Sequence, residues 1–290
     1  MRFRWDWIEP VLSVPYVPTL GPARPDDPLH AMFEAVVAAA GTGEFLPFDK
    51  DARWFDSKAE HVLVEHIRHD PHRTLIPTLV QGRSRTVKVH VYGNDPDSRA
   101  AGAALARKLA AVHGVPRACV VWFLGPHVPA EEVRGIGTRV QLKTFDDGPG
   151  AKPDVQVLDY KQLREPEWFA AFAGTMKEDG FAFLYDQMRS CTVGPVLTVV
   201  DEGTVAGAIG PMETMGDVSG RARLLPQYFG VLPEYRGLGY GRALWRAAMH
   251  WGYEHGAAYQ LLQTEVGGTS DRLCAAEGLR SLGFVNQSTV

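Results

Sequence analysis

A glycine-rich segment in the last quarter of the chain has the residue types and spacing to bind a phosphate group. Gly237, Gly239 and Gly241 alternate with other residues between Arg236 and Arg242, after a predicted strand and at the start of a predicted helix. Because glycine lacks a Cβ atom, successive backbone N–H groups can converge there, and the helix dipole adds partial positive charge. The segment therefore predicts a cradle for a pyrophosphate, with two arginine side chains beside it.

Two widespread phosphate-binding motifs do not match this segment. A dinucleotide-binding fold uses G-x-G-x-x-G in an early βαβ unit, whereas the spacing here is G-x-G-x-G and only 49 residues follow Gly241. A P-loop needs Gly-Lys-Ser/Thr, which the chain does not contain. A tight strand-to-helix turn that binds no ligand is the remaining alternative.

The segment and its surroundings resemble the GNAT family (GCN5-related N-acetyltransferases), which bind acetyl-CoA. Arg236-x-x-Gly239-x-Gly241 resembles the family signature R/Q-x-x-G-x-G/A, and Leu282-Gly283-Phe284 resembles the Leu-Gly-Phe before its last strands. The resemblance covers about residues 154–290. It implies acetyl-CoA as cosubstrate, no metal, and a fourth strand that splays from the fifth to admit the pantetheine arm. The cofactor-binding residues that it implies are Phe229, Gly230, Val231, Arg236, Gly237, Leu238, Gly239, Tyr240, Gly241 and Arg242.

The resemblance leaves the acid and the base of the reaction unassigned. Alignment on the glycine motif places Leu225 where some members have a glutamate base. Alignment on the Leu-Gly-Phe motif places Leu279 where many members have a tyrosine acid. Pro226 is consistent with a bulge in the fourth strand, because proline cannot donate to a central ladder. The catalytic candidates are Tyr228 and Glu265, with Gln227, Ser270 and a water chain as alternatives, and both candidates could instead be ordinary strand residues.

Histidines and cysteines do not indicate a metal site. His66, His69 and His72 are three residues apart, but Asp70-Pro71 interrupts any helix that would bring them to one face. The three cysteines are far apart and odd in number, which argues against a disulfide framework and against a Cys-based metal site. They are Cys119, Cys191 and Cys274.

The elements that must position the glycine segment form a mixed pattern. Period-two alternation and apolar runs predict strands at 87–91, 118–124, 140–142, 155–158, 196–200, 205–209, 222–231, 259–266 and from 284. Helical spacing predicts helices at 29–41, 59–67, 97–113, 165–176, 239–255 and 271–282. A hairpin followed by alternating strands and helices favours an α+β fold with a mixed, mostly antiparallel sheet flanked by helices. The resemblance implies the acyl-CoA N-acyltransferase fold.

The chain divides into two predicted domains, residues 1–150 and 151–290. Segment 146–153 contains two glycines, two prolines and three charged residues, which is typical of a linker. The two halves share a short similarity in sequence, because Arg99-Ala100-Ala101-Gly102 begins a predicted helix as the glycine segment does. The first half could therefore be a degenerate GNAT-like copy that lacks the cradle glycines, with coincidence as the alternative.

Composition excludes several classes of protein. The 290 residues are 45% hydrophobic with a net charge of −4, which excludes a disordered chain and gives no bulk basicity for nucleic acid. No run approaches the roughly 18 apolar residues of a membrane span, and no signal core follows the N-terminal charges. We expect a soluble cytoplasmic protein, either a monomer or a homodimer.

The expected function is transfer of the acetyl group of acetyl-CoA to a primary amine of a small molecule by direct attack. A small acceptor is favoured over a protein, because nothing in the chain resembles a peptide-docking motif. Two alternatives remain open at this point: a non-catalytic acyl-CoA-binding or regulatory module, and transfer of a different acyl group.

Overall fold

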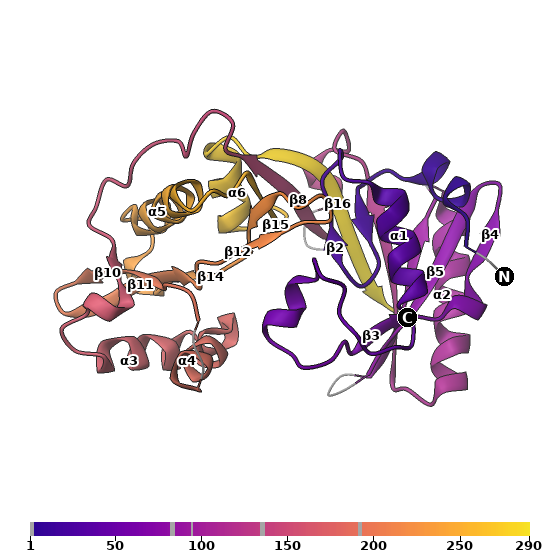
Figure 1. The fold of residues 1–290 in the computed structure, drawn as a ribbon, viewed down its shortest axis with the longest axis horizontal. Helices are drawn as coiled ribbons and strands as arrows, with labels where there is room; N and C mark the ends of the chain where they lie inside the picture. The colour runs from indigo at the N-terminus through magenta and orange to yellow at the C-terminus, as the bar shows by residue number, and fades with distance from the viewer. Residues whose placement is uncertain (1–2, 82–84, 94, 134–136, 191–192) are drawn as a thin grey trace. The chain divides into compact units, whose positions relative to one another are not determined.

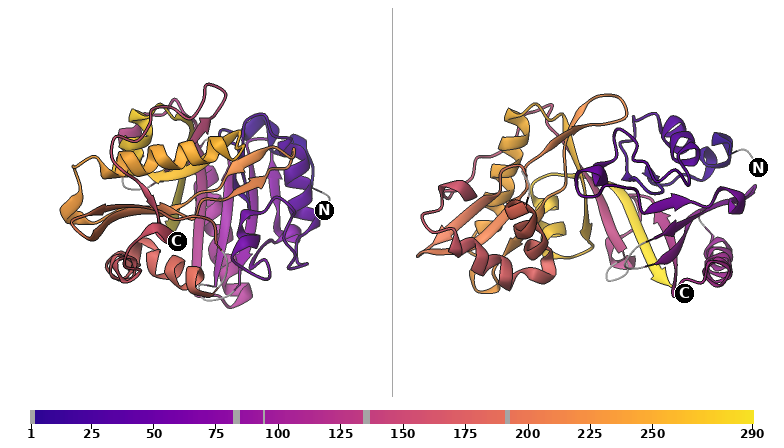
Figure 2. Two further views of the ribbon diagram at one scale, coloured as in Figure 1. Left: turned by 60° about the vertical axis from the view of Figure 1, so that its left-hand side comes forward. Right: turned by 60° about the horizontal axis from the view of Figure 1, so that its bottom comes forward.

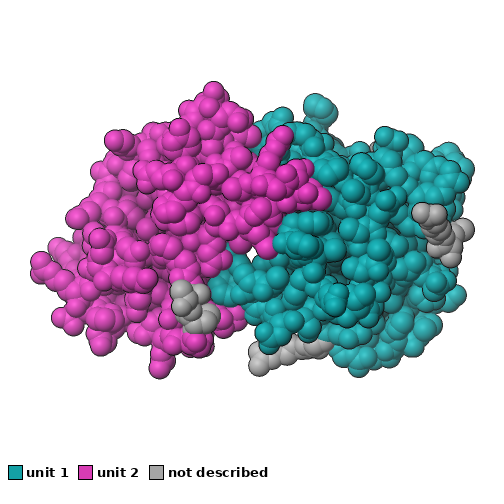
Figure 3. All heavy atoms as spheres, viewed as in Figure 1, with its two compact units in different colours: residues 1–143, 261–290 teal, residues 144–260 magenta. Residues whose placement is uncertain are grey.

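The computed structural model describes residues 3–81, 85–93, 95–133, 137–190 and 193–290, so Cys191 lies outside the described residues. Two compact units make up the chain (Figures 1 and 3). The first contains residues 1–143 and 261–290, and the second contains residues 144–260. A mixed, mostly antiparallel sheet with flanking helices confirms the expected fold class.

The first unit is built on strands in the order β8-β16-β7-β6-β5-β3. Only β6 and β7 run parallel among these described neighbours. A short hairpin of β1 (Tyr16–Val17) and β2 (Gly21–Pro22) precedes them. The strands are β3 (Glu60–Val62), β4 (Arg68–Asp70, beside β5), β5 (Arg73–Val80), β6 (Thr86–Tyr92), β7 (Arg117–Leu124), β8 (Gly137–Thr144) and β16 (Arg280–Thr289).

Helices cover both faces of β6. The odd-numbered residues from Val87 to Val91 pack against α2 (Pro96–His113) in one apolar cluster with Leu105 and Leu109. On the opposite face, Phe33 of α1 (Leu29–Ala38) lies edge-on against Tyr92 at 5.7 Å between ring centroids. Figure 2 shows the indigo N-terminal segment and α2 on opposite sides of these strands. Both faces of this strand are buried, because His90 and Tyr92 are inaccessible as well as the valines, although alternation of apolar and polar residues is typical of a strand with one buried face.

The second unit has a four-stranded sheet in the order β14-β11-β10-β9. Helix α5 lies on one side of this sheet, and α3 and α4 lie on the other (Figure 1). Phe169, Phe172 and Phe181 fill the core on the α3–α4 side. The elements are β9 (Leu158–Asp159), α3 (Glu167–Thr175), α4 (Phe181–Ser190), β10 (Leu197–Asp201), β11 (Thr204–Gly210), β12 (Thr214–Gly216), β13 (Ala222–Leu224), β14 (Tyr228–Val231) and α5 (Tyr240–Glu254).

Four expected elements differ from the structure. The strand expected at 155–158 is reduced to its last residue, which begins β9. The helix expected at 59–67 is β3 followed by a 3-10 turn, because Glu60–Val62 pairs with β5. The strand expected at 222–231 breaks into β13 and β14. The helix expected at 271–282 is α6 (Thr269–Ala276), which stops where Gly278 adopts a φ of +77° and the chain turns into β16.

The compact units divide the chain at 143–144 and again at 260–261, whereas the sequence predicted one division at residue 150. Residues 261–290 belong to the first unit, because β16 pairs antiparallel with both β7 and β8. The chain therefore passes from one unit to the other twice, at 143–144 and within β15 (Tyr259–Glu265). None of the described helices is both long and apolar enough to cross a bilayer.

Candidate active site

The candidate site begins where the expected long strand breaks. β13 pairs parallel with β15 through Arg223 with Tyr259 and Leu224 with Gln260. After the three residues 225–227 the chain continues as β14, which pairs with β11 instead. Pro226 lies in this break, as its missing N–H group favours. The single strand predicted at 222–231 is therefore two strands, β13 and β14, which pair in different sheets.

The outer edge of β14 presents backbone groups that no described strand pairs with. β14 is the outermost strand of its sheet among the described residues. Leu232 N–H donates to Ala206 O, so the residues of even number on β14 face β11 in the alternating antiparallel ladder. The N–H and C=O groups of Phe229 and Val231 consequently face the outer edge. Arg236 Nε donates to Val231 O at 3.1 Å, which fixes this arginine at the end of the strand.

The glycine segment forms a turn that leaves the start of α5 open. Gly237 and Gly239 have φ angles of +84° and +88°, in the left-handed region that favours glycine. No described atom lies within 4 Å of a Cβ built on either residue. The first bond inside α5 runs from Ala243 N–H to Gly239 O, and no described side chain caps the helix. The preceding amides are therefore available to an anion.

The other cofactor candidates have structural roles that the sequence did not show. A Cβ on Gly230 would lie 2.7 Å from Met176 Cε, so this glycine allows the α3–α4 layer to approach β14. Tyr240 OH donates to Asp201 Oδ2 at 2.8 Å, and this bond raises the pKa of Tyr240. Leu238 and Arg242 are exposed on the turn and on the first turn of α5.

The start of α2, which corresponds in the first half to the start of α5, is capped by a side chain. Asp95 accepts hydrogen bonds from Ser98 N at 2.7 Å and from Ser98 Oγ at 2.6 Å, so a carboxylate already caps this helix. A Cβ on Gly102 would lie 2.5 Å from Val91 Cγ2, which makes this glycine a close packing contact. Arg99 lies over the Trp122 ring at 5.7 Å. The first unit therefore has no equivalent cradle at α2.

The two catalytic candidates belong to different units. Tyr228 is half-buried, and its ring lies so close to Gly180 that a Cβ there would be 2.4 Å from Tyr228 Cε1. Phe181 and Phe183 each lie 6.3 Å from the same ring. Glu265 is an exposed residue at the end of β15 in the first unit.

An amide network fills the break between β13 and β14. Gln260 Nε2 donates to Gln227 Oε1 at 2.8 Å and to Leu225 O at 3.3 Å, and Gln227 Nε2 also donates to Leu225 O. Gln260 is buried, and its Oε1 has no partner among the described residues. The alternative candidate Gln227 therefore holds the backbone of the break, whereas Ser270 lies in the first turn of α6.

Glu213 is an acidic residue near the break that the sequence did not single out as catalytic. Leu225 N–H donates to Glu213 O at 2.9 Å, which extends the β12–β13 register from Thr214 and Leu224 by one pair. Directly opposed residues of antiparallel strands project to the same face. Glu213 is thus the cross-strand neighbour of Leu225. Only its position just after a predicted hairpin could have indicated it.

No three histidine, cysteine or acidic side chains of the described residues come together in the way that a metal site requires. His69 Nδ1 lies 3.0 Å from Thr74 Oγ1, and its ring stacks on Trp7 at 5.0 Å. Cys119 and Cys274 are buried thiols, and burial raises the pKa of Cys274 to about 12.

Comparison with known proteins identifies one family. Residues 157–275 match the model of the acetyltransferase (GNAT) family. No curated protein matches the chain significantly. The match includes the break, β14, the glycine segment and α5.

Solved structures of similar architecture include three acetyltransferase-family proteins. A GCN5-related N-acetyltransferase from Sphaerobacter thermophilus is 15% identical over 74% of this chain and 76% of that chain, with a TM-score of 0.46. One from Kribbella flavida is 15% identical over 78% and 90%, with a TM-score of 0.46. A tandem GNAT protein from the clavulanic acid biosynthesis pathway is 16% identical over 76% and 78%, with a TM-score of 0.45.

Proposed function

Because residues 157–275 match the model of the acetyltransferase (GNAT) family, we propose that this protein transfers the acetyl group of acetyl-CoA to a primary amine of a small molecule. The observation that carries the proposal is the open start of α5. Among the described residues, no side chain caps this helix start, and the space beside Gly237 and Gly239 is empty. A pyrophosphate fits such a start, because it accepts hydrogen bonds and complements the helix dipole. Arg236 and Arg242 add positive charge there.

The edge of β14 supports the second part of the proposal. An extended arm with amide groups can pair with an exposed strand edge as an added strand does. Phe229 N–H and Val231 N–H face that edge, and Val231 O is already bonded to Arg236. Bound acetyl-CoA supplies an activated thioester. Phe229 N–H is the donor we assign to the thioester oxygen, where it stabilises the charge that develops during attack.

Proton transfer needs a group that accepts a proton from the amine and one that returns a proton to the thiolate. We retain Tyr228 and Glu265 for these roles and add Glu213 as a third candidate, because it is the cross-strand neighbour of Leu225. Steady-state kinetics can test each candidate separately in the variants Tyr228→Phe, Glu213→Gln and Glu265→Gln. A residue in the role should lower kcat by about 100-fold or more. If a variant keeps the kcat and the pH profile of the parent, the substituted residue does not transfer a proton in the reaction.

The cofactor site is tested by Gly239→Glu. This change forces a side chain onto a φ of +88° and places a carboxylate where the anion would bind. Calorimetry should show acetyl-CoA binding at least about tenfold weaker than in the parent. Gly256→Glu is the matched control, because Gly256 has a φ of +75° and open space but follows the other end of α5. Equal affinity in both variants would contradict the proposal.

Two alternatives are distinguished by one assay. Leu225 and Leu279 stand where many family members have acid and base groups, which motivates a non-catalytic acyl-CoA-binding module. Protein and a library of small amines are mixed with acetyl-CoA, or with a longer acyl-CoA in a parallel series, and free thiol is measured over time. Amine-dependent thiol release supports the transferase. Tight acetyl-CoA binding without release for any amine supports the binding module, and release only with a longer acyl-CoA supports a different acyl group.

A further inference from the structure

A polar hollow of about 510 Å³ lies within the first unit, on the face of β6 that is opposite α2. Lys88 and His90 project into it from β6, because they alternate with the valines that face α2. Val121 and Val285, from β7 and β16, form part of an apolar floor. The volume is in the range of small-molecule sites.

An ion pair forms one wall of this hollow. Lys88 Nζ lies 3.1 Å from Glu60 Oε2, and Thr78 Oγ1 donates to Glu60 Oε1 at 2.7 Å. Burial alone would raise the pKa of Glu60, but Lys88, His90 and the hydrogen bonds from Thr78 and Lys88 lower it, so the carboxylate stays charged. An apolar pair of similar size often costs less to bury than an ion pair. Stability alone therefore gives little reason to bury these charges.

Two uncharged polar side chains stand beside the ion pair. The rings of Tyr16 and His90 are 6.0 Å apart between centroids. Burial lowers the pKa of His90 to about 4, and His90 Nδ1 lies 3.3 Å from Ile76 O, which leaves Nε2 as an acceptor. Burial, and next the charge of Glu60, raise the pKa of Tyr16, so its hydroxyl remains a donor.

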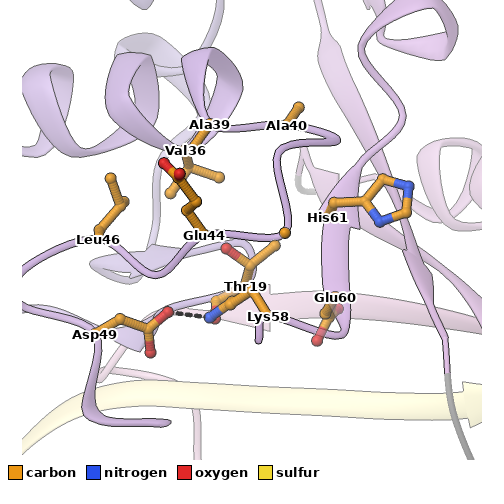
Figure 4. A pocket seen from close by; sticks show the side chains of 11 residues that line it. Thr19, Val36, Ala39, Ala40, Glu44, Leu46, Asp49, Lys58, Glu60 and His61 are labelled. Atoms are coloured by element: carbon orange, nitrogen blue, oxygen red, sulfur yellow. Dashed lines mark hydrogen bonds and ion pairs between the residues drawn. The ribbon is translucent and has the colours of Figure 1, made fainter. Parts of the chain in front are cut away.

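The rim of the hollow is held in place by a second buried ion pair. Lys58 Nζ bonds to Asp49 and donates to Thr19 O at 2.6 Å, with side-chain exposures of 10% for Lys58 and 2% for Asp49. Figure 4 shows this pair in a smaller hollow that shares Thr19 and Glu60 with the larger one. Thr19 on the rim is therefore held in place before a ligand binds, which lowers the entropic cost of binding there.

The acids that line the larger hollow, and Asp49 at its rim, each pair with a lysine. Asp49 pairs with Lys58, Glu60 pairs with Lys88, and Asp51 pairs with Lys50 at 2.6 Å. A ligand with net charge would leave part of this balance uncompensated. A ligand with no net charge, whose positive and negative groups lie close together, complements this arrangement of ion pairs.

We propose that this hollow binds the zwitterionic head group of an α-amino acid. The ligand carboxylate accepts from Lys88 Nζ and Tyr16 Oη, and the ligand ammonium donates to Glu60 and His90 Nε2. Lys88 has three N–H donors and Glu60 has four lone pairs, so both keep capacity beyond their mutual bond. The ligand side chain then packs over Val121 and Val285. This site is independent of the proposed acetyl transfer, because it does not use the cradle at α5.

The test is calorimetry of the full chain with single probes: each of the twenty L-amino acids, succinate as a dianion and putrescine as a dication. We expect at least one amino acid to bind, with both controls at least about tenfold weaker. Lys88→Met and Tyr16→Phe should each weaken that amino acid by about tenfold or more. Lys108→Met, which changes an exposed lysine of α2, should leave its affinity unchanged.

The melting temperature of each variant shows whether it folds, and Tyr16→Phe removes only a hydroxyl. Three results would each overturn the site: no amino acid binds at millimolar concentration, succinate or putrescine binds as well as the best amino acid, or folded Tyr16→Phe and Lys88→Met bind as the parent does. Acetyl-CoA binding measured in the same samples reports on the proposed function separately.

Discussion

At the scale of single residues, His90 shows how burial determines the response of this protein to acid. Its side chain is 2% exposed, and burial lowers its pKa from 6.5 to about 4. Glu60 on β3 opposes this shift, and Lys88 on β6 and the Ile76 carbonyl on β5 are its other neighbours, with the Tyr16 ring beside it. The unfolded chain therefore takes up this proton at a higher pH than the folded chain.

The folded state should accordingly lose stability as the pH falls from about 6.5 to about 4, by up to roughly 3 kcal/mol from this residue. From about pH 7.5 upward the residue is neutral in both states and contributes no pH dependence. A His90→Gln variant should show a shallower loss in urea denaturation measured across this range. His30→Gln, which changes an exposed histidine of α1, is the control and should follow the parent. Identical slopes for His90→Gln and the parent would contradict this assignment.

At the scale of elements, sequence patterns predicted helices and strands wherever one local signal was sufficient. The hairpin of β10 and β11 forms as expected, and Glu202 and Gly203 take the positive φ angles that its tight turn needs. The left-handed turn at Gly237 and Gly239 could also be predicted, because glycine spacing encodes a backbone conformation directly. The break at 225–227 could be predicted only as a bulge, since β13 and β14 find partners in different sheets that no local pattern specifies.

Other elements were missed for the same physical reason. Ala59, Val62, Leu63 and Ile67 have helical spacing, yet pairing with β5 outweighs this weak preference. The cross-strand position of Glu213 depends on the β12–β13 register, and the hollow at Lys88 brings together residues from β3, β6 and the β1–β2 hairpin. Sites assembled from segments distant in sequence become visible only once the strands are ordered.

At the scale of the whole molecule, the two halves repeat an order of strand, helix and parallel strand but differ where a cofactor would bind. β6 and β7 pair continuously from Thr86 to Val91, whereas the pairing of β13 with β15 stops at Leu224. The start of α2 is capped by Asp95, whereas the start of α5 has no described side-chain cap. The first half therefore offers neither an opening between these strands nor an uncapped helix start for acetyl-CoA.

We therefore expect calorimetry to give one acetyl-CoA per chain, with a melting temperature that rises with ligand concentration because binding favours the folded state. Arg236→Ala should weaken binding by about tenfold, since it removes a cation beside the cradle and releases Val231 O. Arg99→Ala is the matched control from the first half, where the arginine lies over Trp122, and should leave affinity unchanged. Two equivalent sites, or loss of acetyl-CoA binding in Arg99→Ala, would show that the first half binds cofactor after all.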